Sequence, residues 1–450
     1  MLRTKNGDVG GGLQGDKESQ ASVLTALGHQ WPWDLYTRRN RRAFLLVLFL
    51  VGASNYVDRN IIGVVLEPIK TEFHVSDTML GILSGISFAL FYATLGIPIA
   101  RWADRGDRKL VITLSLSLWS LMTALCGLTS TFWQLAAARF GVGAGEAGAI
   151  PTAQSLLADY YPPTGRAKAI GVFMMSSSAG YAVALVLGGF VAQNYGWRAA
   201  FLLVGLLGIG LAPLTHLVLK EPRQLSQFAM PSTDGESTLA AIRTLFAKPA
   251  YRYILGAIVA YFLMAYGALV FIVSFMVRVH GLNIAQAGGT FGTISAIGAI
   301  IGNLAGGTFA DRLAARDVAW LARLAGWGMI GALPLYELAL SASTIAAITP
   351  LLLLSTIVLA GVVPPMFSAL HMVCGSKRRA ISVAVAFFFA NLIGLGAGPV
   401  IAGSLSDVLS IAYGKADGLR YALMIVMMIF VPGGCLMLRA AQYLNTDAED

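Results

Sequence analysis

The chain has 450 residues, of which 56% are hydrophobic and only 12% are charged. In a soluble domain about 25% of the residues are charged. So few charges cannot cover a water-facing surface of this size, and we expect much of the apolar surface to face lipid. The net charge of +9 could suggest a nucleic-acid partner, but the distribution of the basic residues argues against one.

Twelve apolar segments are long enough to cross a bilayer, because a spanning helix needs about 20 mostly apolar residues. Backbone groups in lipid must find partners within their own segment, so we expect helices throughout. Only a short basic turn separates the tenth segment from the eleventh. The segments are residues 43–66, 79–101, 110–129, 132–157, 167–193, 198–219, 252–278, 287–310, 318–341, 345–372, 380–406 and 418–440.

Lys and Arg orient these segments. With the N-terminus placed in the cytoplasm, twenty-two basic residues fall at cytoplasmic positions and five on the outside. This bias satisfies the positive-inside rule with both termini in the cytoplasm. It favours a bacterial inner membrane, with an organelle as the alternative, and it explains the basic charge without a nucleic-acid role.

The longest polar stretch between spans divides the chain into two sets of six. We predict a disordered cytoplasmic tail at 1–40, a six-helix bundle at 41–219 and a cytoplasmic linker at 220–249. A second six-helix bundle follows at 250–442, and a cytoplasmic tail at 443–450.

Internal similarity between the two sets indicates a duplication. The second span ends in Asp104-Arg105, with Arg108 shortly after it, and the eighth span ends in Asp311-Arg312. The two Asp-Arg pairs are 207 positions apart, close to half of the chain.

These paired turns resemble the major facilitator superfamily, although Ala100 and Asp107 stand where that family usually has Gly. The segments NYVDR at 55–59 and RFGVGAGE at 139–146 are similar to the spinster family within it. The resemblance implies an all-α fold of twelve helices in two pseudo-symmetric bundles, acting as one chain. It also implies a transporter of lysophospholipids or sphingoid phosphates that works by alternating access with proton coupling.

The same resemblance implies a conformational gate made by the two Asp-Arg turns. In the family such turns form charge pairs between neighbouring helices. The gate would consist of Asp104, Arg105, Arg108, Asp311 and Arg312. The competing interpretation is simple capping of helix ends by charges that match the helix dipole.

Four ionisable residues stand out inside the spans: Asp58, Arg59, Arg139 and Glu146. Each charge placed at mid-membrane costs about 2.5–3.5 kcal/mol on insertion scales, so such residues default to a function. At 1.5 Å per residue, Asp58 and Glu146 lie at similar depths, roughly 22 Å and 18 Å from the cytoplasmic side.

We assign proton coupling to Asp58 and Glu146, and anchoring of an anionic head group to Arg139, Arg59 and Asn55, with Arg139 as the main anchor and Arg59 also balancing charge. A carboxylate that exchanges an Arg partner for a proton is a two-state switch. The guanidinium fork of Arg suits phosphate or carboxylate. The competing interpretation is a permanent ion-pair cluster that only fixes helix packing.

Aromatic and polar residues in other spans are candidates for the cavity wall. An aromatic, partly polar wall suits an amphipathic lipid, and ordinary packing is the alternative for each residue. The candidates are Tyr56, Tyr261, Phe262, Tyr266, Met366, Phe367 and Asn391.

The main alternative to a lipid transporter is a proton-linked carrier of small organic anions or drugs. A membrane-embedded lipid enzyme is less favoured, because no span shows paired His or a metal-type spacing. A primary pump is also disfavoured, because no GxxxxGK[ST] nucleotide loop occurs. A channel is a further alternative that the composition does not exclude. We therefore expect no catalytic residue, no metal and no cofactor, with protons, a small amphipathic lipid and membrane lipids as partners.

Overall fold

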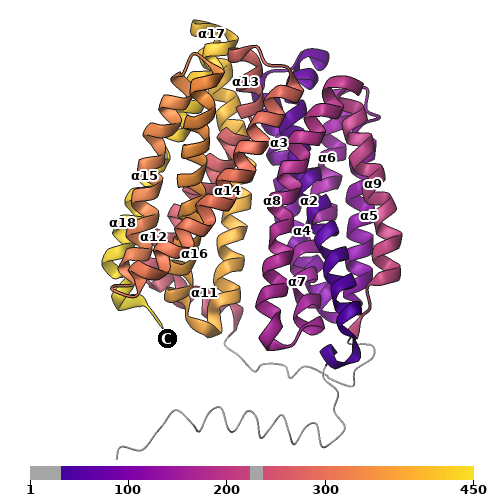
Figure 1. Ribbon diagram of the computed structural model, residues 1–450, viewed down its shortest axis with the longest axis vertical. Coiled ribbons are helices and arrows are strands. Elements are labelled where there is room, and N and C mark those ends of the chain that lie inside the picture. Colours follow the sequence, from indigo (N-terminus) through magenta and orange to yellow (C-terminus); the bar gives the residue numbers. More distant parts are fainter. Residues whose placement is uncertain (1–31, 223–236, 450) are drawn as a thin grey trace, which may run out of the picture.

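The computed structural model describes residues 32–222 and 237–449, and Figure 1 shows helices packed side by side along one axis. Within these two ranges the chain forms no β-strand. The tail at 1–31 and most of the predicted linker, at 223–236, lie outside the described residues, so the predicted domain bounds stay a prediction.

The first half of the molecule contains six helical passes. Gly85 interrupts the second pass, and Ala147 and Gly148 interrupt the fourth. A short 3-10 helix, η1 (Pro32–Leu35), precedes them. The helices are α2 (Arg38–Phe73), α3 (Asp77–Ser84), α4 (Ile86–Arg105), α5 (Arg108–Cys126), α6 (Phe132–Glu146), α7 (Ala149–Tyr160), α8 (Pro163–Tyr195) and α9 (Trp197–Val218).

Local sequence explains where these helices begin. Thr37, Ser76, Asp107 and Thr131 each precede a helix, and each side chain accepts a hydrogen bond from a backbone N–H of the first turn. These groups have no partner inside the helix, so the caps stabilise its start.

The second half repeats the pattern after a short helix, α11 (Thr238–Ala247). Its helices are α12 (Pro249–Leu269), α13 (Ile272–His280), α14 (Ile284–Ala314), α15 (Ala319–Ser341), α16 (Ile345–Phe389), the π-helix η2 (Ala390–Leu395), α17 (Gly396–Met427) and α18 (Phe430–Asp447).

Two glycines turn the chain within continuous helical segments of the second half. Gly375 in α16 and Gly414 in α17 have φ of 63° and 80°, a backbone conformation that side chains with a Cβ rarely adopt. The rings of Tyr413 and Tyr421 lie 4.9 Å apart, which shows that the chain reverses its direction near Gly414. Each glycine therefore separates two passes, and Gly375 lies in the short basic turn between the tenth and eleventh predicted spans.

Nine segments of the described ranges are long and apolar enough to cross a membrane. One of them, Ile381–Asp447, contains the turn at Gly414 and counts as two passes. With the interrupted pass α6–α7 and the helix α15 added, the described ranges hold twelve passes. This confirms the predicted all-α architecture of a twelve-helix membrane protein.

The outer surface of the bundle carries large apolar side chains that water would not tolerate in such numbers. Leu206, Leu207 and Leu217 of α9 are between 59% and 72% exposed. Extended apolar patches of this kind mark a surface that contacts another apolar phase. Here that phase is the lipid bilayer, which explains the low charge of the chain.

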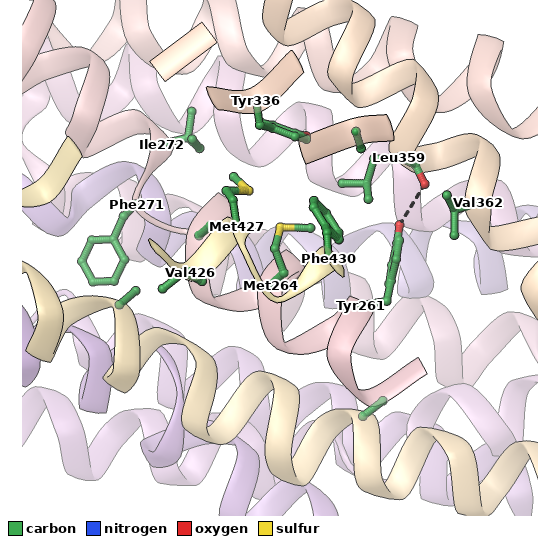
Figure 2. Close-up of a cluster of buried hydrophobic side chains, with 14 of the residues drawn as sticks. Tyr261, Met264, Phe271, Ile272, Tyr336, Leu359, Val362, Val426, Met427 and Phe430 are labelled. Atoms are coloured by element: carbon green, nitrogen blue, oxygen red, sulfur yellow. Dashed lines mark hydrogen bonds between the residues drawn. The ribbon is translucent and has the colours of Figure 1, made fainter. Parts of the chain in front are cut away.

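Each half has its own apolar interior. In the second half, Met264 of α12, Tyr336 of α15 and Phe430 of α18 lie together without exposure to solvent (Figure 2). Tyr261 donates a hydrogen bond of 3.4 Å to the carbonyl of Leu359, which satisfies its hydroxyl inside this core. This packing of buried side chains holds the helices of the half together.

The two halves, α2–α9 and α12–α18, lie side by side in Figure 1. The start of α2, the end of α18 and the helix α11 lie at one end of the bundle, which we call the terminal end. The turns that hold α3, α13 and the bend of α17 lie at the opposite end, which we call the far end.

Candidate functional site

The four predicted intramembrane charges lie together inside the first half. Asp58 and Arg59 come from the middle of α2, and Arg139 and Glu146 come from α6. Asp58 and Glu146 are fully buried, and Arg59 and Arg139 are 9% and 1% exposed. The structure therefore brings the charged side chains of the two helices together, as their similar depth predicts.

Arg59 and Glu146 form the ion pair of this cluster. The Nε and Nη2 atoms of Arg59 donate to Oε2 of Glu146 at 3.3 Å and 2.9 Å. Removing one partner from a buried pair costs about 3–5 kcal/mol, because it strands the other charge. The pair is thus firmly held until another group replaces one partner.

Asp58 and Arg139 meet differently. Arg139 donates from Nη1 to the backbone carbonyl of Asp58 at 3.1 Å, and the Asp58 carboxylate accepts a long hydrogen bond of 3.4 Å from Ser54. In the described chain no ion pair joins Arg139 to either carboxylate. Arg139 therefore holds the α2 backbone at Asp58, a residue whose side chain is buried inside the first half.

Several polar atoms of the cluster have no hydrogen-bond partner among the described residues. They include both amide atoms of Asn55, Oδ1 of Asp58, Nε and Nη2 of Arg139 and Oε1 of Glu146. An unsatisfied buried polar group costs about 1–3 kcal/mol, and more when it is charged. The cluster thus has unused donors and acceptors, which a proton or a changed rotamer can satisfy.

A cavity of about 330 Å³ lies between the halves. Arg59 is the charged residue of its described wall, and Tyr56, Tyr261, Phe262 and Tyr266 line it as well. Its surface is mainly apolar and aromatic, with polar positions such as Ser177, Ser178, Ser295 and Thr356.

Aromatic rings surround the guanidinium of Arg59. Its Cζ lies 4.8 Å from the ring centre of Phe88, 4.7 Å from that of Tyr92 and 5.6 Å from that of Tyr56. Cations are attracted to aromatic faces at these distances. The rings therefore hold the guanidinium between Glu146 and the cavity.

Three predicted cavity-lining residues, and Arg139 and Asn55 of the predicted substrate anchor, lie away from this cavity wall. Met366 is fully buried in the core of the second half, and Phe367 stacks on Phe387 at 5.5 Å. Asn391 donates to the carbonyl of Phe387 at 2.7 Å within its own helix, where the π-helix η2 begins. Arg139 is covered by Phe88, whose ring centre lies 5.5 Å from its Cζ.

The predicted gate residues are dispersed. Arg108 is buried, with Nη2 2.6 Å from Asp159 and 2.6 Å from Glu221, so it ties α5 to the ends of α7 and α9 within the first half. Asp311 and Arg312 are exposed and form no ion pair among the described residues. The side chains of Asp104 and Arg105 lie outside the described residues.

A second charged group lies at the far end, and the sequence analysis did not predict it. Arg278 of α13 donates to both oxygens of Asp77 at 2.7 Å and to Glu67 at 2.8 Å. Lys70 adds a bond of 2.6 Å to Asp77. Since Glu67, Lys70 and Asp77 belong to the first half and Arg278 to the second, these bonds join the halves.

Asp407 of α17 completes this group from the second half. Its carboxylate accepts hydrogen bonds of 2.8 Å from the backbone N–H groups of Asp77 and Thr78, at the start of α3. Ser406 donates to Asp77 at 2.6 Å. We call Glu67, Lys70, Asp77, Arg278 and Asp407 the charge latch.

Close helix contact accompanies the charge latch. A Cβ added at Gly403 of α17 would collide with the carbonyl of Asp77, and one added at Gly81 of α3 would collide with the carbonyl of Pro399. The sequence did contain a signal for this contact. Acidic residues follow the first span and a lone Arg ends the seventh, both on the side poor in basic residues.

Comparison with known proteins identifies the family. Residues 48–399 match the Major Facilitator Superfamily. The chain belongs to this superfamily. It is a membrane transporter rather than an enzyme.

Individual relatives fall within the same group. The chain is 32% identical to an MFS-type efflux pump of Mycolicibacterium smegmatis, covering 93% of this chain and 96% of that protein. It is 25% identical to protein spinster homolog 1 of Xenopus tropicalis, covering 96% of this chain and 85% of the relative.

A solved structure shares the fold with a TM-score of 0.85 and 29% identity, covering 92% of this chain and all of the other. It is a bacterial homolog of the human lysosomal transporter Spinster, in an inward-facing and unoccupied conformation. The predicted resemblance to the spinster family is thereby confirmed.

Proposed function

We propose that the chain is a proton-coupled secondary transporter that moves an anionic amphipathic lipid by alternating access. One observation carries the proposal: Arg59 borders an apolar and aromatic cavity while its guanidinium is bound to the buried Glu146. The cavity suits an acyl chain and the guanidinium suits a phosphate or carboxylate head group. The similarity to a probable sphingolipid transporter, a spinster homolog of Arabidopsis thaliana, supports a lipid substrate.

The Arg59–Glu146 pair supplies the coupling step. A substrate anion that enters the cavity competes with Glu146 for Arg59, and a Glu146 left without its cation then takes up a proton. Release of the substrate restores the pair and expels the proton. Asp58 is the second proton carrier, because its carboxylate has a free oxygen and no cationic partner among the described residues.

The two arginines were both assigned to the substrate anchor on sequence alone, and we now propose separate roles for them. Arg59 is the better candidate for the substrate anchor, since it borders the cavity. Arg139 is the better candidate for holding Asp58, since it binds the backbone carbonyl of that residue.

The positive-inside bias supports an orientation with both termini in the cytoplasm of a bacterial inner membrane, and we propose a monomer. The far end, which the charge latch joins, is then the outer end, and the conformation is closed to the outside. Transport requires an opposite state in which the latch is broken. The turn containing Asp104 and Arg105 is a candidate for the gate of that state.

The test is uptake of labelled lysophospholipid into proteoliposomes with and without an imposed pH gradient. The pH gradient should accelerate uptake by the wild type, and Asp58→Asn and Glu146→Gln should remove that acceleration. Both variants keep the size of the side chain but remove its charge and its ability to take up a proton. Unchanged pH dependence in both would contradict the proton role.

The second candidate is a proton-linked carrier of small organic anions or drugs. It is favoured by the modest cavity of about 330 Å³ and by the similarity to an efflux pump. Thermal stabilisation separates the two. Stabilisation by lysophospholipids supports the lipid transporter, whereas stabilisation only by small anions or drugs supports the alternative.

A further inference from the structure

One further acidic residue lies within a membrane pass and has no role in the site described above. Glu337 is four residues from the end of α15, near the far end of the second half. One of its carboxylate oxygens, Oε1, is buried and has no hydrogen-bond partner among the described residues. No ion pair reaches Glu337 in the described ranges either. Glu337 is partly buried, and a nearby cation would offset the water that its Oε1 atom has lost.

A cavity of about 400 Å³ opens beside Glu337. Its other walls come from the two arms of α17 and the residue after it, and include Tyr413, Tyr421, Met424 and Met428. We call it the Glu337 cavity. It shares no lining residue with the central cavity that contains Arg59.

The fold builds this cavity with the turn at Gly414. Because the chain reverses there, Tyr413 and Tyr421 face each other with an angle of 73° between their rings. Tyr413 is 56% exposed and Met428 is 60% exposed. Leu338, the neighbour of Glu337, is 58% exposed as well, so this surface faces lipid rather than the other half.

The residues that line the cavity favour a cation that carries apolar groups. A carboxylate supplies the opposite charge, and tyrosine faces attract ammonium groups, including quaternary ones. Met side chains adapt to irregular apolar ligands. The nearby Arg420 does not fill this role, because it pairs with Asp417 at 2.7 Å.

We propose that the Glu337 cavity binds the ammonium head group of a membrane lipid, with the acyl chains along the exposed surface of α15 and α17. The position supports a membrane source over a soluble cation. Glu337 lies near the end of a membrane pass, and the cavity is otherwise lined by apolar and tyrosine side chains.

The experiment measures lipid retained by the full-length protein after exchange into nanodiscs, using native mass spectrometry. The two bilayers contain either phosphatidylethanolamine or phosphatidylglycerol. The wild type should retain phosphatidylethanolamine preferentially, and Glu337→Gln should reduce that retention about tenfold, since a charge-assisted contact becomes a neutral one. Tyr421→Leu, which keeps the carboxylate, should reduce it less.

Glu72→Gln is the matched control, because it removes an acidic residue at the same end that lies outside the cavity wall and pairs with Arg198 of the first half. Its lipid retention should equal that of the wild type. Equal retention by Glu337→Gln and the wild type, or preference for phosphatidylglycerol, would overturn the proposal. Displacement of the lipid by millimolar tetramethylammonium alone would overturn the membrane source.

Discussion

The Arg59–Glu146 pair lies inside one half of the molecule, whereas the charge latch joins the two halves. The central pair is buried, and Asp77 of the charge latch is as inaccessible, whereas the other residues of the charge latch are only partly buried. Their hydrogen bonding differs. Both oxygens of Asp77 are bound by Arg278, while the central cluster leaves oxygens of Asp58 and Glu146 without partners.

This difference in saturation fits the two different tasks that we propose for these groups. A group with unused donors and acceptors can change partners without moving a helix, as proton exchange requires. A saturated group between rigid bodies holds one conformation and must break as a whole when the bodies separate. The central cluster is therefore suited to chemical coupling, and the charge latch to setting which conformation is populated.

The largest effect should come from breaking the central pair. Arg59→Ala leaves Glu146 buried without a cation, and we expect a loss of about 3–5 kcal/mol in stability together with loss of transport. Thermal unfolding in detergent and uptake assays measure the two effects. Arg59→Ala combined with Glu146→Gln should recover most of the stability but not transport. Equal stability of the single and double variants would contradict the buried-pair interpretation.

The next effect should come from the charge latch. Arg278→Ala removes the bonds from α13 to Glu67 and Asp77, and hydrogen bonds to charged groups contribute about 1.5–3 kcal/mol each. The population should shift by at least about tenfold toward the state open at the far end. Spin labels at Tyr195 and Ile411, which are exposed at that end, report the separation of the halves. An unchanged distance distribution would show that the latch does not set the conformation.

A smaller shift in the same direction should follow from Gly403→Ala. The new Cβ would collide with the carbonyl of Asp77, and overpacking of this kind costs about 1–3 kcal/mol in the closed state. The same spin-label distance should lengthen. Gly210→Ala is the control, because a Cβ there meets nothing within 4 Å, and it should leave the distance unchanged. A lengthened distance in both variants would point to a general effect of helix substitution.

The smallest effect is expected for Arg198→Ala. Arg198 pairs with Glu72 at 2.6 Å, but both residues belong to the first half and are 35% and 43% exposed. Exposed pairs contribute about 0–1 kcal/mol, and this one does not cross between the halves. Spin-label distances and transport should match the wild type. A shift as large as that of Arg278→Ala would mean that any lost arginine at the far end opens the molecule.

Much of the fold could be predicted from the sequence because lipid imposes simple rules. Each pass needs a long apolar run, and the predicted segments match the observed passes, including the pair that Gly375 divides. The central cluster could also be predicted, because ionisable residues inside a span are conspicuous. Glu67, Asp77 and Glu337 near the ends of passes were overlooked, since a charge at that depth is common at a membrane interface.

The sequence by itself determined that this is a twelve-helix membrane protein, and it determined which charges lie at its centre. Both follow from the chain's local content of apolar and ionisable residues. Only the tertiary structure decided that Arg59 rather than Arg139 borders the cavity, and that Asp77 meets Arg278 across the halves. Those contacts depend on the rotation and depth of helices far apart in sequence, which packing sets.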